Sequence, residues 1–382
     1  MVHGLLICRD SDTRELLGRF IRGSGQIVLD RFFCPIPTAY ELTTALQTLP
    51  IDVVYLDTSS ESAQSIGDQI RSDYPGIALI GFSTASLAEA QNRVAEFSLE
   101  LPFSVEGLLA TTRSAISALL KEPYRKVVAI LPSKAGSGAS TIAINLAANL
   151  AALSRRVILV DADLRSGAIG DCIGMQPRLA VAETLSLADV AAQLIWPRHV
   201  TQKDGIDFLL TDRDPGKPRP EWHSYHHLLR FLNDRYDHIV VDLPELANDA
   251  TSFALQHAWS VYLAVTPEPL SLKLAHQRLD ELKAAGVDSK RIGVLVNRWE
   301  RGCLSQKDIE QALAHPVTGV FPGDYRCVSA SILEQRFVPF KTKLGQSYRS
   351  FATNLTSSRK TNEADPVRVG LLDGLRFLRK AV

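Results

Sequence analysis

Three features that mark specialised protein classes are scarce or missing in this sequence. Cysteine is rare: the 382 residues contain five, with no CxxC pair, at Cys8, Cys34, Cys172, Cys303 and Cys327. Disulfide frameworks and zinc or iron–sulfur sites use closely spaced cysteines, so we expect reduced, mostly buried thiols. A charge excess is also missing, because Lys and Arg together number 42 and so do Asp and Glu. Proteins that coat nucleic acid normally carry a basic excess, so no specific nucleic-acid binding is expected.

Long hydrophobic runs are missing as well. A membrane-spanning helix needs about 20 consecutive apolar residues, and no stretch of the sequence approaches that length. The N-terminal apolar run covers only residues 5–8 and ends in charge, which excludes a signal peptide. We therefore expect a cytoplasmic protein. Hydrophobic residues make up 46% of the chain, which is enough for two ordinary cores in domains of about 100–200 residues each.

Alternating strand and helix patterns predict an α/β protein with two doubly wound parallel-sheet domains. In the first domain, residues 1–118, short apolar runs at 5–8, 51–56 and 77–82 alternate with segments of helical spacing. Residues 119–125 are charged and contain a proline, which predicts a linker. The second domain is predicted for residues 126–353, with strands expected at 126–131, 157–160, 206–210, 238–241, 261–265, 292–296 and 317–321. Residues 354–382 are predicted to be a polar linker followed by an amphipathic tail.

A glycine-rich segment follows the first strand of the second domain. Residues 133–141 read SKAGSGAST and precede an alanine-rich helix. In this position backbone N–H groups can point at a phosphate, and the helix N-terminus adds partial positive charge. Gly138 and Ser140 fit the P-loop pattern GxxxxGK[ST], but Ser133 replaces its first glycine and Ala139 replaces its lysine. A merely flexible turn is the alternative.

The segment resembles the deviant phosphate loop of the MinD/ParA ATPases, K-G-G-x-G-K-[ST]-[ST]. Lys134, Gly136, Gly138, Ser140 and Thr141 match that pattern, whereas Ala135 and Ala139 depart from it. The resemblance implies a P-loop NTPase-like fold that binds ATP and Mg²⁺. It implies phosphate contacts from Gly136, Ser137, Gly138, Ala139, Ser140 and Thr141. It also implies a homodimer in which Lys134 reaches the nucleotide of the partner subunit.

Acidic residues at strand ends support the resemblance. Residues 157–165 contain Asp161 and Asp163, as in the second motif of the family, where the later aspartate lies near the attacking water. Residues 236–244 end an apolar run on Asp242, a Walker B pattern. The family pattern implies that Ser140, Asp242 and Asp161 hold Mg²⁺ and that Asp163 and Lys134 are catalytic. Asn297 is the candidate for reading adenine, with an ordinary strand end as the alternative.

Ala139 affects catalysis more than binding. The P-loop lysine places positive charge on the β- and γ-phosphates during phosphoryl transfer, and alanine supplies none. Loss of a preorganised charge contact of this kind costs on the order of 3 kcal/mol in the transition state. Ser140 and the backbone amides remain available for Mg²⁺ and phosphate. We therefore expect nucleotide binding with slow hydrolysis or none.

The first domain resembles a response-regulator receiver. Asp57 matches the phosphoacceptor, Asp10 one metal-binding acid and Ser83 the hydroxyl position. Arg9 stands where the second acid is expected, and Leu101 stands where the lysine is expected. Phosphorylation needs acids for Mg²⁺ and a cation for the phosphate. A degenerate docking or dimerisation domain is therefore expected, with a working receiver as the alternative.

A receiver-like domain followed by a MinD/ParA domain with a GxGAST loop resembles the CpaE/TadZ family. This resemblance implies a localisation or scaffold factor for assembly of the Tad (Flp, type IVb) pilus, with Tad pilus secretion components as partners. It implies a site at the cell pole or peripherally on the inner membrane. A ParA-type partitioning ATPase that binds DNA as an ATP dimer is the alternative. The zero net charge and Ala139 count against that alternative.

The C-terminal tail, residues 369–382, is amphipathic. On a helical wheel its apolar side chains Leu371, Leu375, Leu378 and Val382 share one face. Such a helix, with basic residues opposite, suits peripheral contact with an anionic membrane surface. Docking of the same leucines on the core of the protein is the alternative. His223, His226 and His227 fit an amphipathic helix without further metal ligands, so no metal site is assigned to them.

Overall fold

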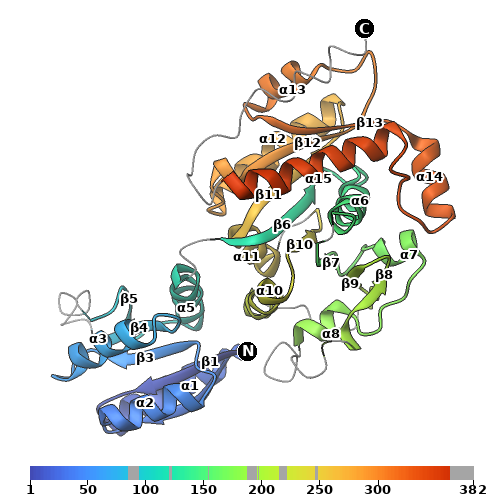
Figure 1. Ribbon diagram of the computed structural model, residues 1–382. Coiled ribbons are helices and arrows are strands. Elements are labelled where there is room, and N and C mark those ends of the chain that lie inside the picture. Colours follow the sequence, from blue (N-terminus) through green and yellow to red (C-terminus); the bar gives the residue numbers. More distant parts are fainter. Residues whose placement is uncertain are drawn as a thin grey trace. The chain divides into compact units, whose positions relative to one another are not determined.

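The chain folds into two compact units, Met1–Pro123 and Tyr124–Val382, each with its own β-sheet (Figure 1). The computed structural model describes residues 1–84, 94–119, 123–153, 155–186, 196, 198–214, 222–245 and 248–361. The predicted tail at 369–382 lies outside the described residues. Within the described part of the chain, no helix combines the length and the apolar character needed to cross a membrane.

The first unit is a five-stranded, fully parallel sheet in the order β2-β1-β3-β4-β5. Its strands are β1 (Val2–Ile7), β2 (Ile27–Phe33), β3 (Val53–Asp57), β4 (Ala78–Thr84) and β5 (Phe97–Leu101). Its helices are α1 (Ser11–Gly23), α2 (Ala39–Thr48), α3 (Ala63–Asp73) and α5 (Val105–Leu119). This is a doubly wound order, as predicted, in which the loops after β1 and β3 meet at one edge of the sheet.

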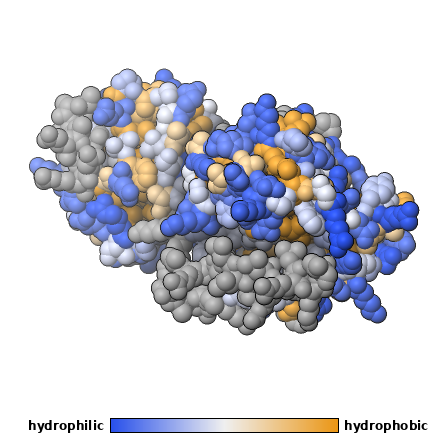
Figure 2. Space-filling view, turned by 90° about the horizontal axis from the view of Figure 1, so that it is seen from above, coloured by the Kyte–Doolittle hydropathy of each residue, from blue (hydrophilic) through white to orange (hydrophobic). Residues whose placement is uncertain are grey.

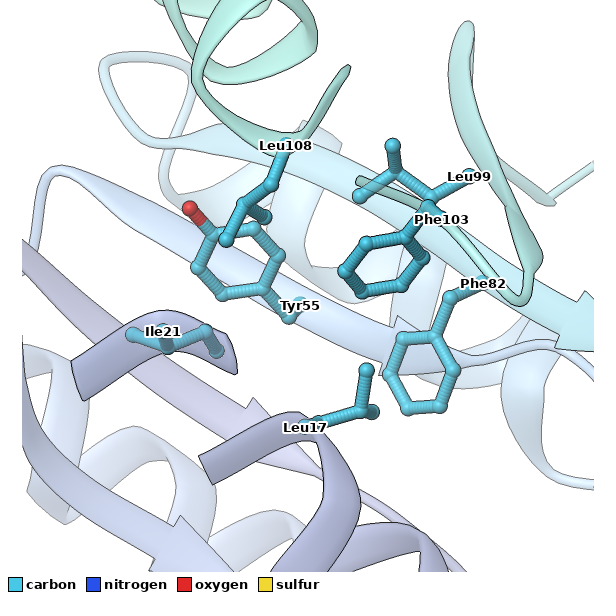
Figure 3. A pocket seen from close by; sticks show the side chains of 7 residues that line it. All are labelled: Leu17, Ile21, Tyr55, Phe82, Leu99, Phe103 and Leu108. Carbon is cyan, nitrogen blue, oxygen red and sulfur yellow. The ribbon is translucent and has the colours of Figure 1, made fainter. Parts of the chain in front are cut away.

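The core of the first unit explains why the sequence pattern predicts its central strands. Strand β3 is buried along its whole length, so its residues form a continuous apolar run. On one face of the sheet Tyr55 packs with Leu17 and Ile21 of α1 and Leu108 of α5 (Figure 3). The Tyr55 hydroxyl shares a 2.8 Å hydrogen bond with the hydroxyl of Thr112, which satisfies both groups in the apolar interior.

The second unit contains an eight-stranded sheet in the order β13-β12-β11-β6-β10-β7-β9-β8. Its strands are β6 (Tyr124–Pro132), β7 (Val157–Asp161), β8 (Thr201–Lys203), β9 (Ile206–Leu209), β10 (His238–Asp242), β11 (Ala258–Val265), β12 (Ile292–Trp299) and β13 (Val317–Pro322). Every pairing is parallel except that of β8 with β9. The predicted parallel sheet is confirmed, with an antiparallel strand added at one edge.

Helices cover both faces of this sheet. They are α6 (Ala139–Ala151), α7 (Ile169–Ile173), α8 (Val181–Ser186), α10 (Trp222–Arg235), α11 (Asp249–His257), α12 (Pro269–Ala284), α13 (Gln306–Leu313), α14 (Tyr325–Leu333) and α15 (Lys343–Thr361). The chain passes from β6 to β7 in one direction and from β10 to β11 in the other. Because such crossovers are right-handed, α6 lies on one face and α11 on the opposite face.

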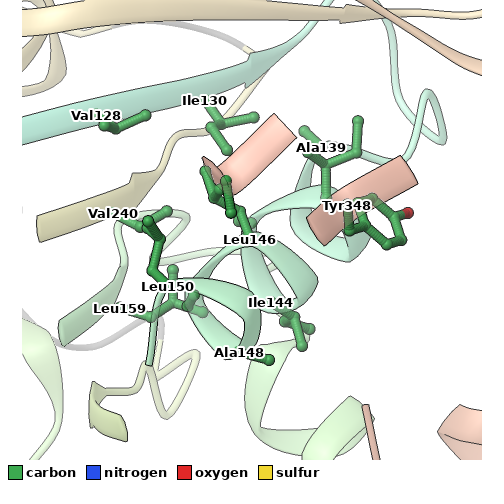
Figure 4. Close-up of a cluster of buried hydrophobic side chains, with 14 of the residues drawn as sticks. Val128, Ile130, Ala139, Ile144, Leu146, Ala148, Leu150, Leu159, Val240 and Tyr348 are labelled. Atoms are coloured by element: carbon green, nitrogen blue, oxygen red, sulfur yellow. The ribbon is translucent and has the colours of Figure 1, made fainter. Parts of the chain in front are cut away.

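Helix α6 lies at the centre of the larger core. Its apolar side chains, among them Leu146 and Leu150, are fully buried over Ile130 of β6 and Val240 of β10 (Figure 4). The alanines of this helix let its backbone approach the sheet closely. Helix α15 runs beside α6 (Figure 1), and its Phe351 packs against Tyr262 and Phe321 with ring centroids 5.1 and 5.8 Å away.

Two predicted segment boundaries are wrong. Strand β6 begins at Tyr124, inside the expected linker at 119–125, because Tyr124 pairs with Ala258 of β11. Helix α15 continues to Thr361, where a polar linker was expected from residue 354. Phe351, Ala352 and Leu355 are buried along one side of α15, and its other side is polar. A polar-rich stretch is thus held helical by a narrow apolar stripe.

Candidate nucleotide-binding site

Strand register brings together residues that are far apart in the sequence. Strands β6, β10 and β7 are adjacent and parallel, so the segments that follow their carboxyl ends lie at one edge of the sheet. Asp242 of β10 is the register partner of Asp161 of β7, and on its other side it pairs with Ile130 of β6. The loop after β6 is the glycine-rich segment 133–138. The predicted loop and the two predicted acids therefore meet at one place.

The glycine-rich loop uses its glycines for conformation. Gly136 and Gly138 have φ angles of 78° and 90°, in the left-handed region that favours glycine. Gly138 is also the N-cap of α6, so the loop leads directly into the helix N-terminus. The loop closes on itself through the Ser137 N–H, which donates to the Lys134 carbonyl at 3.1 Å. In such a strand–loop–helix arrangement, backbone N–H groups and the helix N-terminus can bind an anion.

Asn297 holds this loop from a distant strand. Its side-chain N–H donates to the Ser137 carbonyl at 2.9 Å, and its Oδ1 accepts from the Arg298 N–H at 3.0 Å. A Cβ atom at position 138 would collide with the Asn297 amide, so glycine is also needed for this close approach. The sequence pattern suggested adenine as the partner of Asn297. The structure shows a loop-positioning contact, and adenine recognition stays a prediction.

Lys134 lies at the start of the loop and pairs within its own chain. Its Nζ is 3.5 Å from Oε2 of Glu268, the N-cap residue of α12. The Lys134 side chain is 24% exposed and that of Glu268 is 56% exposed, so water screens the pair strongly. Sequence reasoning missed Glu268. Its Pro-Glu-Pro context after β11 signals a helix start but no ion pair.

Ala139 occupies the position where the P-loop pattern has lysine. Its side chain is 5% exposed and packs in the core cluster of α6 (Figure 4). Only its backbone N–H, in the first turn of the helix, is suited to phosphate binding. Ser137 is fully buried, and its hydroxyl has no hydrogen-bond partner among the described residues. The loop thus offers backbone and hydroxyl groups, with the cationic side chain of Lys134 at its margin.

The two register-paired acids, Asp161 and Asp242, are buried, and few hydrogen bonds from the described residues offset their negative charges. Asp161 is 0% and Asp242 1% exposed. Within the described residues, the carboxylate oxygens of Asp161 and Oδ1 of Asp242 have no side-chain hydrogen-bond partner, and the backbone N–H groups of Ile169 and Asp163 lower the pKa of Asp161 only in part. Burial, with the charges of Asp242 and Asp163, raises the pKa of Asp161 well above its usual value. The pKa of Asp242 is raised to about 7. Burial is the largest cause of this shift, a hydrogen bond with Ser140 opposes it, and the negative charge of Asp163 adds to it.

This donor set fits a hard divalent cation. Buried carboxylates without protein donors are unfavourable unless a proton or a cation compensates their charge. Carboxylate and hydroxyl oxygens are the ligands that Mg²⁺ uses beside phosphates, and Ser140 supplies a hydroxyl next to Asp242. The residues present therefore suit the magnesium ion that the sequence motifs imply.

Asp163 differs from its two neighbours. It is partly exposed, and its Oδ1 accepts from the N–H groups of Arg165 and Ser166 at 3.2 and 2.9 Å. The Gly167 N–H closes the same turn on the Asp163 carbonyl at 2.8 Å. The turn packs against Asp161, since a Cβ atom at Gly167 would collide with the Asp161 carboxylate, while the Asp163 carboxylate stays partly exposed. Its position is compatible with a contact to water, and its catalytic role stays a prediction.

The carboxylates at the corresponding edge of the first unit are, by contrast, satisfied by the protein. Asp57 accepts from the Arg9 N–H at 3.2 Å and from the N–H and hydroxyl of Ser59 at 3.0 and 2.6 Å. Asp10 caps α1 by accepting from the N–H and hydroxyl of Thr13. These bonds hold the pKa of Asp10 below its usual value. Neither acid is left as an open metal ligand.

The second unit is similar to proteins of known family. Residues 128–335 match the model of the CobQ/CobB/MinD/ParA nucleotide binding domain. The septum site-determining protein MinD of Synechocystis sp. is 24% identical over 212 residues, which cover 53% of this chain and 78% of that protein.

Solved structures show the same fold. A ParA family ATPase from Chlorobium tepidum TLS has a TM-score of 0.56 at 22% identity and covers 60% of this chain and 99% of its own. MinD from Pyrococcus horikoshii OT3, solved as a complex with Mg-ADP, has a TM-score of 0.52 at 21% identity and covers 63% and 99%. At these identities the likeness establishes the fold of the second unit.

Asp57 should not accept phosphate. Its oxygens are occupied by Arg9 and Ser59, and Asp10 is committed to a helix cap. We expect the full-length protein to keep its mass when incubated with acetyl phosphate and Mg²⁺, as read by intact-mass spectrometry. A stoichiometric phosphate adduct that is absent in D57N would contradict this expectation.

The raised pKa of Asp242 predicts a pH-dependent stability. Its folded value of about 7 lies above the usual unfolded value, so the contribution is fully present below about pH 4 and is lost as the pH rises through 7. In EDTA, the melting temperature of the wild type should fall between pH 5 and 8 relative to that of D242N. Addition of Mg²⁺ with ATP should raise the melting temperature of the wild type at pH 8 and should raise that of D242N much less. Parallel pH profiles of the two proteins would refute the assignment.

Proposed function

The chain belongs to the CobQ/CobB/MinD/ParA nucleotide-binding domain family, and we propose that it is a dimeric switch controlled by ATP and Mg²⁺. One observation carries this proposal: the glycine-rich loop meets two buried carboxyl groups, Asp161 and Asp242, whose charges are offset only in part, by the Ser140 hydroxyl and nearby backbone N–H groups. The similar MinD of P. horikoshii was solved with Mg-ADP, which supports this choice of ligand.

Each part of the site has a proposed task. The backbone N–H groups of residues 136–141 bind the phosphates, and the N-terminus of α6 adds its partial positive charge. Ser140, Asp242 and Asp161 hold the magnesium ion. Bound Mg²⁺ supplies positive charge to the terminal phosphates. Asp163, partly exposed at the start of its turn, orients water, and Asn297 holds the Ser137 carbonyl in place.

The same site lacks an efficient catalytic charge. Ala139 carries no cation and its methyl group is packed in the core. The missing charge contact costs on the order of 3 kcal/mol in the transition state, which corresponds to a rate loss of roughly a hundredfold. Binding depends mainly on the backbone and on the magnesium ligands, so it is affected less. The protein therefore holds ATP for long periods, as a switch requires.

ATP binding and hydrolysis test this part of the proposal. We expect calorimetry to show Mg-ATP binding below millimolar nucleotide, with turnover slower than about one per second, the low end of ordinary enzymes. An A139K variant that keeps the wild-type melting temperature should hydrolyse ATP roughly a hundredfold faster. Absence of binding at millimolar ATP would refute the nucleotide site. Wild-type turnover of about one per second or more would refute the switch.

Dimerisation is proposed to depend on the release of Lys134 from Glu268. In the single chain these side chains form an exposed ion pair. For Lys134 to reach the phosphates of a partner subunit, it must leave Glu268. A phosphate is a stronger attraction for an ammonium group than one screened carboxylate, because it offers more charge and more acceptor oxygens. ATP in the partner subunit thus favours the dimer, and Glu268 favours the monomer.

Light scattering with and without ATP measures this balance. We expect K134A to abolish the ATP-dependent dimer. E268Q should lower the ATP concentration needed for dimerisation by up to about fivefold, because an exposed pair contributes at most about 1 kcal/mol. K273A, which removes an exposed lysine of α12, is the matched control and should behave as wild type. A protein that is monomeric under every condition would refute the model. A dimer insensitive to ATP and to K134A would point to another interface.

For the cell, we propose a localisation and scaffold role in Tad (Flp, type IVb) pilus assembly, with pilus secretion components as partners. Support comes from the combination of a receiver-like unit, whose acids are satisfied internally, with a MinD/ParA unit that lacks the P-loop lysine. A unit without phosphotransfer chemistry is suited to docking. The amphipathic tail at 369–382 is proposed as a peripheral membrane contact at the cell pole or inner membrane.

Microscopy of a fluorescent fusion tests the cellular role. We expect discrete polar or envelope foci, loss of pilus assembly in K134A, and recovery of pilus secretion proteins with the wild type but not with K134A. Deletion of residues 369–382 should weaken binding of the purified protein to anionic vesicles. Localisation over the nucleoid, with pili unaffected by deletion of the gene, would favour a DNA-partitioning ATPase instead.

A further inference from the structure

Two cysteines that are 26 positions apart meet at the edge of the first sheet. Cys8 follows β1 and Cys34 follows β2, and the preceding residues Ile7 and Phe33 are register partners. The Cys8 N–H donates to the Phe33 carbonyl at 3.0 Å, so the parallel pairing continues to this level. Neighbouring strands are about 4.8 Å apart, which lies within the Cα separation that disulfides require.

The Cys8 side chain also points toward the strand that leads to Cys34. The Cys8 thiol donates to the Phe33 carbonyl, with 3.6 Å between Sγ and the oxygen, so it points toward the residue that directly precedes Cys34. Both cysteines are in the reduced state. Cysteines that follow register-paired residues of adjacent strands can form a disulfide after rotation about their Cα–Cβ bonds.

The surroundings give the two thiols different tasks. Cys8 is completely buried, whereas Cys34 is partly exposed. Burial, then the neighbouring Cys34, then the negative charges of Asp57 and Asp10, raise the pKa of Cys8 to about 12. A buried thiol of this kind does not meet an oxidant first. Solvent reaches the Cys34 thiol, whereas the Cys8 thiol is buried next to it.

We propose that Cys8 and Cys34 are a reversible thiol–disulfide pair that records oxidation by peroxide. The Cys34 sulfur attacks hydrogen peroxide; its S–O bond forms as the O–O bond breaks, and the released hydroxide takes the thiol proton to become water. The Cys8 sulfur then attacks the Cys34 sulfur; the S–S bond forms as the S–O bond breaks, and a second water leaves with the Cys8 proton. Two thiols lose two electrons and two protons, and one peroxide becomes two waters.

The disulfide would act on the sheet edge that holds Asp57 and Asp10. Arg9 and Asp10 directly follow Cys8; the Arg9 N–H binds Asp57 and Asp10 caps α1. A covalent link between β1 and β2 fixes the start of this loop and removes the thiol donor that faces Phe33. The disulfide would thereby give this edge of the first unit a chemical input of its own.

Thiol counting on the full-length protein tests the pair. The protein is treated with hydrogen peroxide, quenched, denatured, alkylated and analysed by mass spectrometry. We expect two of the five thiols to escape alkylation, a loss of two hydrogen atoms in intact mass, a Cys8–Cys34 linked peptide, and full reversal by dithiothreitol. The variant C303S, which removes an exposed cysteine, is the matched control and should give the same linked peptide.

Single variants separate the two roles. In C34S, Cys8 should remain alkylatable at every peroxide dose that links the wild type. In C8S, oxidised Cys34 should accumulate as a sulfenic acid that dimedone traps. Circular dichroism shows whether each variant is folded, and C34S, at the partly exposed position, is the safer of the two. Full alkylation of Cys8 and Cys34 after peroxide, or a linked peptide that joins other cysteines, would overturn the proposal.

Discussion

The register between β7 and β10 is the constraint on which the candidate site depends. It places Asp161 and Asp242 side by side at the ends of two fully buried strands, where both carboxyl groups are almost completely buried. Two like charges in such a setting favour protonation or a bound cation. The adjacent pairing of β10 with β6 puts the glycine-rich loop beside them. The proposed metal and phosphate sites therefore lie together, because the order of three central strands places them at one edge of the sheet.

The loop itself is shaped by residues from the other half of the sheet. Asn297, at the end of β12, fixes the Ser137 carbonyl, and Glu268, after β11, holds Lys134. Ser133 is tied to the same region, since its N–H donates to the Ala264 carbonyl and its hydroxyl contacts that of Ser271 at 3.1 Å. A movement of the β11 or β12 segments would therefore shift the glycine-rich loop directly.

The two units place carboxylates at the same kind of sheet edge and treat them differently. In the first unit Asp57 and Asp10 accept hydrogen bonds from Arg9, Ser59 and Thr13, so their charge is met by the protein. In the second unit burial outweighs the few hydrogen bonds that the described residues offer to Asp161 and Asp242, so the pKa values of both are raised. A sheet edge whose carboxylates accept hydrogen bonds from the protein is suited to a structural or docking role. A sheet edge whose carboxylates accept few such bonds is suited to binding a ligand. The Cys8–Cys34 pair gives the first edge a chemistry of its own.

The sequence by itself determined the fold class, the phosphate loop and its acidic partners. Strands such as β3, β7 and β10 are buried on both faces, so their sequences are continuous apolar runs. The closely spaced glycines of the loop indicate left-handed backbone angles, which Gly136 and Gly138 adopt. Strands β2, β5 and β8 were missed because edge or half-exposed strands mix polar and apolar residues, as in IVLDRFF. Helix α15 was misread from residue 354 because only its narrow buried stripe distinguishes it from a linker.

Only the tertiary structure decided what each side chain contacts. The Asn297–Ser137 bond spans 160 positions, the Lys134–Glu268 pair joins two loops, and Cys8 meets Cys34 through strand register alone. Local patterns report burial and backbone conformation, because these depend on neighbouring residues along the chain. Contacts between segments depend on which strands become neighbours and in what register, and this is settled only when the whole sheet packs.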